Sequence, residues 1–174
     1  MVEYVVLVDE NDNEIGRAEK LDAHLKGQLH RALSVFLFNT EGQMLIQQRA
    51  FSKYHSGGLW SNACCSHPRP DELPLEAAKR RLWEEMGISC EMEKAFDFIY
   101  KVSLDNQLTE YEFDHVFIGQ SDGDAHPNAE EAHDWKWIDI DALVRDIDDH
   151  PENYTYWFKM VLDKVIAACP TSRA

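Results

Sequence analysis

The sequence predicts a mixed β-sheet with helices packed against it, an α/β or α+β sandwich. Runs of β-branched and aromatic residues recur along the chain, and amphipathic segments of helical period stand between and after them. The 174 residues are 44% hydrophobic and 28% charged, without internal repeats. This composition suits a single globular domain, which we expect to cover residues 1–174.

The first half of the chain predicts mainly strands. Tyr4–Val8 is an apolar run typical of a strand, and the polar residues 9–16 that follow predict a turn. Residues 30–50 predict a β-hairpin, because two apolar runs flank the turn sequence NTEGQ. Residues 51–63, which contain Gly and Ser, are expected to form a loop.

Residues 74–87 predict a helix. Pro74 stands near its start and Gly87 at its end, as helix termini prefer. Its apolar stripe consists of Leu75, Ala78, Leu82 and Met86.

The second half alternates strands and helices. Residues 95–104 and 111–120 predict two strands joined by a polar turn. The remaining expected elements are a loop, a strand and two helices, at residues 122–134, 135–140, 139–147 and 154–168.

The charge of the chain restricts its partners. Seventeen Lys and Arg residues against 32 Asp and Glu residues give a net charge of −15. Nucleic acids and anionic membranes, which are bound by neutralising phosphates, are therefore not expected as partners. A small phosphorylated substrate bridged by divalent cations stays compatible with this charge. We expect a cytoplasmic location, because Tyr4–Val8 is too short for a membrane span and lacks the basic flank of a signal peptide.

The adjacent cysteines in SNACCSHPRPDE allow several interpretations. A disulfide between Cys64 and Cys65 would be strained, and a cytosolic chain with Cys90 and Cys169 as its other thiols is not expected to carry a disulfide framework. A zinc site made of both thiols and His67 would have poor ligand spacing. Two inert buried thiols are the simplest interpretation, and a reactive thiol is the alternative.

Histidines and glutamates supply a possible metal site. His24 and His30 are six residues apart, and His67 follows the cysteine pair. Glu110 and Glu112 are two apart on a predicted strand, so both side chains face the same side. Three imidazoles and two carboxylates suit five- or six-coordinate Mn²⁺, Mg²⁺ or Zn²⁺. Spacing alone does not show that they converge, and each His could instead be a surface or core residue.

The helix at residues 74–87 allows two interpretations. Its Arg and Glu residues four apart could form weak pairs on a solvated face. The same segment resembles the Nudix box, which binds Mg²⁺ and a diphosphate. Ser66 and Arg81 depart from that box, where it has glycine and glutamate. Arg81 weakens a hydrolase interpretation and suggests a cation facing phosphate oxygens. The residues in register with the box are Glu72, Arg80, Leu82, Glu84, Glu85, Gly87 and Ile88.

Nearly the whole chain resembles the type I isopentenyl-diphosphate isomerases. The segments EKLDAHLKGQLHRALSVFLFN, LWSNACCSHP and TEYEFDHVF carry this resemblance in that order. It implies a Nudix-type mixed β-sheet sandwiched by helices. It also implies conversion of isopentenyl diphosphate to dimethylallyl diphosphate by a 1,3 proton shift, in isoprenoid biosynthesis.

The resemblance also implies roles for individual residues. Cys65 and Glu112 would be the catalytic pair, with Cys64 packed in the core. Trp60 is a second candidate beside Trp157 for stabilising a carbocation. The implied ligands of a tightly bound divalent metal are His24, His30, His67, Glu110 and Glu112. Glu85 would hold a Mg²⁺ that arrives with the diphosphate. The implied substrate-binding residues are Lys20, Arg49, Lys53, Arg81, Tyr100 and Trp157.

Two other functions share the predicted fold. A Nudix pyrophosphohydrolase of a nucleoside diphosphate derivative would need the glutamate that Arg81 replaces and would not need Cys65. A non-catalytic metal-binding module would leave isopentenyl diphosphate unchanged. We expect a small diphosphate as the partner and a monomer or weak homodimer as the assembly.

Overall fold

The structure, a computed structural model, describes residues 2–169. Residue 1 and residues 170–174 of the expected domain lie outside this part. The strands and helices in chain order are β1 (Tyr4–Val8), β2 (Glu14–Glu19), α1 (Lys20–Lys26), β3 (His30–Phe38), β4 (Met44–Arg49), β5 (Trp60–Ser61), β6 (Cys64–Ser66), α2 (Pro74–Met86), β7 (Met92–Ser103), β8 (Thr109–Gln120), β9 (Ala132–Ile138), α3 (Ile140–Asp149) and α4 (Tyr156–Ala168). Short 3₁₀ turns at Asp105–Gln107 and Pro151–Asn153 complete the list.

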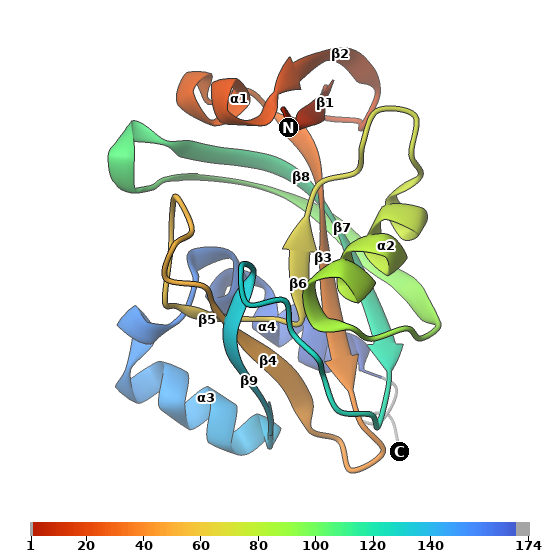
Figure 1. The fold of residues 1–174 in the computed structure, drawn as a ribbon, viewed down its shortest axis with the longest axis vertical. Helices are drawn as coiled ribbons and strands as arrows, with labels where there is room; N and C mark the ends of the chain where they lie inside the picture. Colours follow the sequence, from red (N-terminus) through yellow and green to blue (C-terminus); the bar gives the residue numbers. More distant parts are fainter. Residues whose placement is uncertain (1, 170–174) are drawn as a thin grey trace.

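Strand β3 lies at the centre of the sheet (Figure 1). It runs parallel to β8, from the pair His30↔Glu112 to the pair Phe38↔Gln120. Its other edge pairs antiparallel with β6, and there Ser34 faces Cys65. Neighbours on both edges of β3 place side chains from distant parts of the sequence next to one another.

The predicted hairpin at residues 30–50 is correct at its turn and wrong beyond it. Strands β3 and β4 share a single residue pair, Phe38↔Met44. A strand has only two edges for hydrogen bonding, and β8 and β6 occupy both edges of β3. Strand β4 therefore separates from β3 and pairs with β5 and β9 instead.

Helices cover both faces of the sheet, as expected for the sandwich. Side chains alternate along β3, so Leu33, Val35 and Leu37 share one core with helix α2. Phe36 and Phe38 face the other side and share a second core with α3 and α4. Each fully buried side chain of this kind contributes roughly 1.5–3 kcal/mol. These two cores hold β3 in a fixed position.

The helix predicted at residues 74–87 is confirmed as α2. Pro74 is its first residue, and Gly87 ends it in the left-handed conformation with φ of 64°. A Cβ at position 87 would also lie 2.9 Å from the carbonyl oxygen of His126. Conformation and space therefore both require glycine at this helix end.

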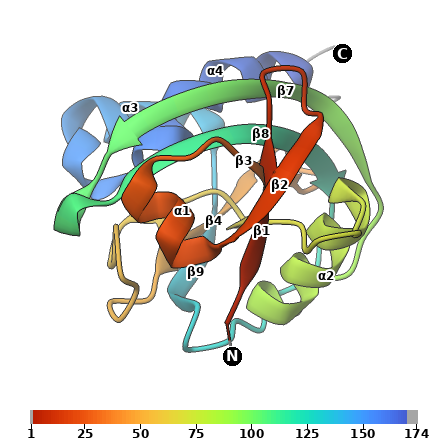
Figure 2. The ribbon, with the colours of Figure 1, turned by 90° about the horizontal axis from the view of Figure 1, so that it is seen from above.

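Several short elements were not predicted. Strand β2 begins inside the expected turn, β5 lies in the expected loop 51–63, and helix α1 had no predicted counterpart. Figure 2 shows α1 and the β1–β2 hairpin together over one end of the sheet, where α1 contacts β8. Within residues 2–169, none of the helices has the length and apolar character needed to cross a bilayer.

Candidate functional site

A cavity of about 740 Å³ opens on the face of β3 that carries Ser34. Its walls come from β3, β6, β8, the two helices α2 and α4, and the N-terminal segment. The predicted site residues that line it are Lys20, Arg49, Lys53, Cys65, His67, Arg81, Glu85, Tyr100, Glu110, Glu112 and Trp157. His24 and His30 are fully buried beside it, with ring centroids 5.8 and 5.0 Å from that of His67.

The two cysteines face opposite sides of the sheet. Cys64 is fully buried in the core shared with α2, whereas Cys65 faces the cavity. This follows from the alternation of side chains along β6. Both thiols are free, so Cys64 packs as expected and only Cys65 is available for chemistry.

Hydrogen bonds fix the thiol of Cys65. The thiol donates to Asn62 Oδ1 at 3.1 Å, and the indole N–H of Trp157 donates to Cys65 Sγ at 3.0 Å. Asn62 is itself held, because its Nδ2 donates to the carbonyl oxygens of Val35 and Cys64. Burial, together with the carboxylate of Asp114, raises the pKa of the Cys65 thiol. The thiol therefore holds its proton at neutral pH.

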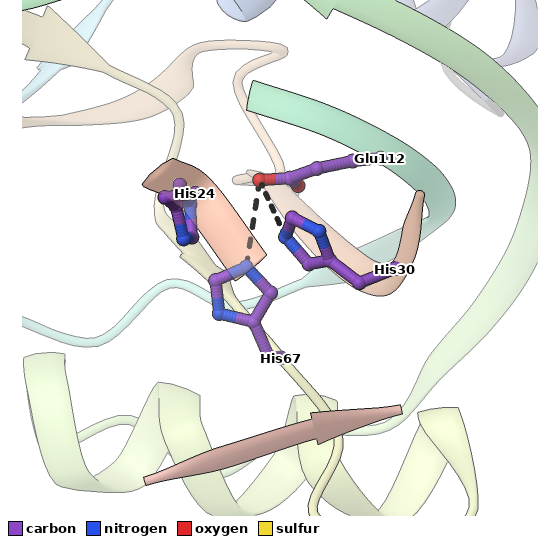
Figure 3. Close-up of side chains that lie close together, drawn as sticks. All are labelled: His24, His30, His67 and Glu112. Atoms are coloured by element: carbon purple, nitrogen blue, oxygen red, sulfur yellow. Dashed lines mark hydrogen bonds and ion pairs between the residues drawn. The ribbon is translucent and has the colours of Figure 1, made fainter. Parts of the chain in front are cut away.

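The side chains predicted to bind a metal lie at one end of the cavity, which we call the metal end: His24, His30, His67, Glu110 and Glu112. Figure 3 shows four of them, His24, His30, His67 and Glu112, which could hold one ion. Glu110 Oε1 lies 4.0 Å from His24 Nε2. The Nδ1 atoms of His24 and His30 lie 2.7 and 2.8 Å from the carbonyl oxygens of Lys20 and Gln28. A carbonyl only accepts, so Nδ1 carries the hydrogen and Nε2 of each neutral ring has a free lone pair. Both Nε2 atoms are buried without a hydrogen-bond partner among the described residues.

Charge and protonation at the metal end favour a divalent cation. Burial lowers the pKa of His67 to about 3 and keeps this ring neutral. Burial alone would raise the pKa of Glu112, but its contacts with His30 and His67 hold that pKa well below its usual range. Glu112 Oε1 lies 3.7 and 3.4 Å from the Nε2 atoms of these rings. Burial also lowers the pKa of His24, whereas His30, which burial alone would affect in the same way, has its pKa raised by Glu112. Two neutral imidazoles and a third ring beside an ionised carboxylate, with unpartnered buried Nε2 atoms, fit Mn²⁺, Mg²⁺ or Zn²⁺.

His55 was not predicted and belongs to the same end. Its Nε2 lies 3.2 Å from Glu110 Oε1, while the hydroxyl of Tyr100 donates to Glu110 Oε2 at 2.5 Å. His24, His55 and Glu110 form a second group that could hold an ion. His55 lies in the predicted loop 51–63, where no periodicity indicates which way a side chain points.

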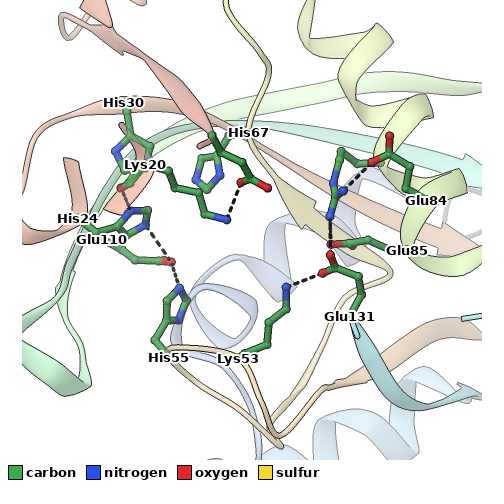
Figure 4. Close-up of polar contacts among 12 residues, drawn as sticks. Lys20, His24, His30, Lys53, His55, His67, Glu84, Glu85, Glu110 and Glu131 are labelled. Atoms are coloured by element: carbon green, nitrogen blue, oxygen red, sulfur yellow. Dashed lines mark hydrogen bonds and ion pairs between the residues drawn. The ribbon is translucent and has the colours of Figure 1, made fainter. Parts of the chain in front are cut away.

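The other end of the cavity, which we call the phosphate end, consists of Lys53, Arg81, Glu85 and Glu131. Arg81 Nη2 lies 2.9 Å from Glu85 Oε1 and 3.2 Å from Glu131 Oε1. Lys53 forms an ion pair with Glu131 (Figure 4). Burial raises the pKa of Glu85, whose Oε2 has no hydrogen-bond partner among the described residues.

Of the remaining predicted residues, Lys20 and Arg49 line the cavity, whereas Trp60 is partly buried against the core shared with α4. Lys20 pairs with Glu3 at 3.0 Å, and the Arg49 guanidinium lies 5.3 Å from the Trp157 ring centre. Trp60 is not part of the cavity lining, and Lys136 Nζ lies 4.8 Å from its ring centre. Of the two tryptophans considered for a carbocation, the structure therefore places Trp157 at the cavity.

Known proteins match this chain closely. A family model described as NUDIX domain matches residues 28–159. Isopentenyl-diphosphate Delta-isomerase 1 of Aromatoleum aromaticum is 54% identical, over 96% of this chain and 94% of its own. The isopentenyl-diphosphate Delta-isomerase of Serratia proteamaculans is 48% identical, over 93% of this chain and 90% of its own. The chain belongs to the isopentenyl-diphosphate Delta-isomerase family.

Solved structures agree with the fold of this Nudix isomerase. A crystal structure of a Deinococcus radiodurans protein superposes with a TM-score of 0.76, covering 97% of this chain and 99% of that one. At 21% sequence identity, this likeness concerns the fold alone. In the isomerase chain, Arg81 turns its guanidinium toward Glu84, Glu85 and Glu131, so a cation sits where the Nudix box has a carboxylate.

Proposed function

We propose that this chain converts isopentenyl diphosphate to dimethylallyl diphosphate by adding one proton to the substrate and removing another. One observation carries the proposal. Strand β3 lies between β6 and β8, so Cys65 and Glu112 approach the same cavity from its two edges. A 1,3 proton shift across two faces of an allylic system requires two such groups.

The protonation of the two groups supports a division of roles. The raised pKa of Cys65 keeps a proton on the thiol, and the lowered pKa of Glu112 keeps its carboxylate ionised. We assign Cys65 as donor to the terminal alkene carbon and Glu112 as acceptor of the proton that leaves the methylene beside the cation. These roles require that the surroundings of each group keep the pKa of Cys65 high and the pKa of Glu112 low.

The walls of the cavity suit a short-lived carbocation. Trp157 is buried, and its N–H orients the thiol that would protonate the alkene. Its ring can attract a cation by roughly 0.5–2 kcal/mol. Trp157 and Glu112 are buried, which would limit the access of water to a cation beside them; water would otherwise capture the cation as an alcohol.

Divalent cations complete the proposal. His24, His30, His67, Glu110 and Glu112 would hold one ion, and Glu85 would hold a Mg²⁺ that accompanies the diphosphate. A bound cation lowers the proton affinity of a carboxylate that it contacts. Lys20, Arg49, Lys53 and Arg81 line the cavity and would contact the diphosphate oxygens.

Proton NMR in D₂O tests this function directly. Isopentenyl diphosphate and Mg²⁺ are incubated with the wild type, with Cys65→Ala and with Cys64→Ala. We expect dimethylallyl diphosphate with deuterium in a methyl group from the wild type and from Cys64→Ala, and none from Cys65→Ala. Cys64→Ala is the matched control, because it removes a thiol that faces the core.

Other results would contradict parts of the proposal. Product from Cys65→Ala at the wild-type rate would remove Cys65 from its role. Absence of product from the metal-loaded wild type, with cleavage of a nucleoside diphosphate derivative to the nucleoside monophosphate, would establish the hydrolase instead.

A further inference from the structure

Glu131 contacts both cations of the phosphate end and has no role in the proposed proton shift. Its carboxylate pairs with Lys53 and also lies 3.2 Å from Arg81 Nη2. Its side chain is 20% exposed, and it lines the cavity. Lys53 and Arg81 are therefore already paired with a carboxylate at the position where we expect diphosphate oxygens.

The backbone holds Glu131 rigidly in this position. Its N–H donates to the carbonyl oxygen of Asn128 at 2.9 Å, and its own carbonyl accepts from Ala50 at 3.0 Å. The N–H of Asn128 donates to the carbonyl oxygen of Glu85 at 2.9 Å. Glu131 is thus tied to the chain segments that carry Lys53 and Glu85, unlike a flexible surface carboxylate.

The charges at this end do not favour a diphosphate by itself. Lys53, Arg80 and Arg81 supply three positive charges. The carboxylates that contact these three side chains are Glu72, Glu84, Glu85 and Glu131. Three cations against four carboxylates leave the group negative when all are ionised. A polyanion would meet this net charge and would also have to displace Glu131 from its partners.

We propose that Glu131 is an internal anion that occupies Lys53 and Arg81 until a diphosphate replaces it, and that it thereby makes diphosphate binding depend on a divalent cation. A divalent cation beside Glu85 would offset the negative charge of the carboxylates. The diphosphate oxygens would then replace Glu131 as the partner of Lys53 and Arg81. Without the divalent cation, Glu131 stays paired with Lys53 and Arg81, and the diphosphate binds weakly. This inference rests on the proposed function for the identity of the ligand as a diphosphate.

Binding of inorganic diphosphate tests the inference. Protein that retains its tightly bound metal is titrated calorimetrically with inorganic diphosphate, with and without added Mg²⁺. We expect Glu131→Gln to bind diphosphate about tenfold more tightly than wild type without Mg²⁺, a typical size for coupling between sites. With saturating Mg²⁺ the two proteins should differ much less, so the Mg²⁺ dependence shrinks in the variant.

Glu84→Gln is the matched control. It removes the same charge from the same arginine, since Glu84 Oε2 lies 2.6 Å from Arg81 Nη1, but Glu84 is not part of the cavity lining. We expect its Mg²⁺ dependence to match wild type. Glu131→Asp keeps the negative charge, so its diphosphate binding should depend on Mg²⁺ almost as strongly as that of wild type. A thermal melt checks that each variant is folded.

Two results would overturn the inference. If Glu84→Gln and Glu131→Gln changed the Mg²⁺ dependence of diphosphate binding equally, the loss of any negative charge near Arg81 would explain the result, and Glu131 would have no special role. Weaker diphosphate binding by Glu131→Gln with Mg²⁺ present would make Glu131 a support for the site and not a competitor. The readout needs no turnover, so a failure of the isomerase assay and a failure of this inference are distinguishable.

Discussion

The two ends of the cavity differ in how their charged and polar groups are partnered within the chain. At the metal end, buried Nε2 atoms of His24 and His30 have no hydrogen-bond partner among the described residues, and the rings are locked by their Nδ1 atoms. At the phosphate end, the charges of Lys53, Arg81 and Glu131 are paired within the chain. Both ends retain buried atoms without a hydrogen-bond partner among the described residues, which at the phosphate end are Arg81 Nε and Glu85 Oε2. The ends differ in charge, because the phosphate end pairs its cations with carboxylates, whereas the metal end presents ring nitrogens.

This difference matches how long each proposed ligand stays. An unsatisfied buried polar group costs about 1–3 kcal/mol, which is tolerable where an ion remains bound. A substrate leaves after each turnover, so residues that bind it benefit from internal partners in the meantime. Four predictions test this comparison, from the largest expected effect to the smallest.

Substitution of Glu112 should affect catalysis and metal retention together. In Glu112→Gln the ionised oxygen between His30 and His67 is lost, and we expect activity to fall by about 10³-fold or more, as for loss of a general acid or base. Elemental analysis should show less metal per protein than in wild type. A variant that keeps full activity would exclude Glu112 from the reaction.

Removal of the tightly bound metal should destabilise the protein without unfolding it. A free ion at a thousand times its dissociation constant contributes about 4 kcal/mol, so we expect the melting temperature to fall by roughly 8–16 °C after chelation. Activity should disappear and return when the ion is restored. Full activity in a sample shown to be metal-free would contradict the assignment of the metal end.

Replacement of Trp157 should have a moderate effect on activity. Phe offers a weaker cation–π surface and no N–H for Cys65, so Trp157→Phe should lower kcat about tenfold, within the range of such contacts. Trp60→Phe is the matched control, because Trp60 is not part of the cavity lining. Equal losses from both substitutions would indicate packing and not a role at the cavity.

Acid should destabilise the metal end before the phosphate end. The pKa of folded His67 is about 3 against a usual 6.5, so the unfolded chain takes up this proton first. The stabilising contribution of His67 is complete above pH 6.5 and is lost as the pH falls toward 3. The pKa of Glu131, which burial would raise, is lowered to about 2 by Lys53 and Arg81, so its contribution is lost only between 4.5 and 2.

Denaturant unfolding of the metal-free protein across this pH range checks the order. Relative to His67→Gln, the wild type should lose about 1 kcal/mol per pH unit below pH 6. Relative to Glu131→Gln, it should lose stability only below about pH 4.5. A loss that begins at the same pH in both comparisons would contradict the difference between the two ends.

Local patterns predicted much of the fold. Period and capping residues indicated α2, and alternation indicated the long strands β7 and β8. The strand pairing of β3 could not be predicted from the sequence, because its partners β6 and β8 come from distant parts of the chain. Elements as short as β5 contain too few residues to show a period.

The site divides in the same way. Glu110 and Glu112 could be placed on one face because they lie in a strand, and the motif around Cys65 carried the family resemblance. His55 and Glu131 were missed because they lie in segments where nothing in the sequence fixes the direction of a side chain. Their partners became visible only once β8 and α2 were in place.

The hydrogen bond from Trp157 to Cys65 joins the last helix to the site, while Lys20 and His24 come from the first helix. During synthesis on a ribosome, the growing chain therefore exposes its cysteine, histidines and glutamates well before Trp157 emerges. A nascent or truncated chain lacks the indole that holds the thiol, and α4 no longer covers Phe36. A fragment that ends before α4 should therefore not process substrate.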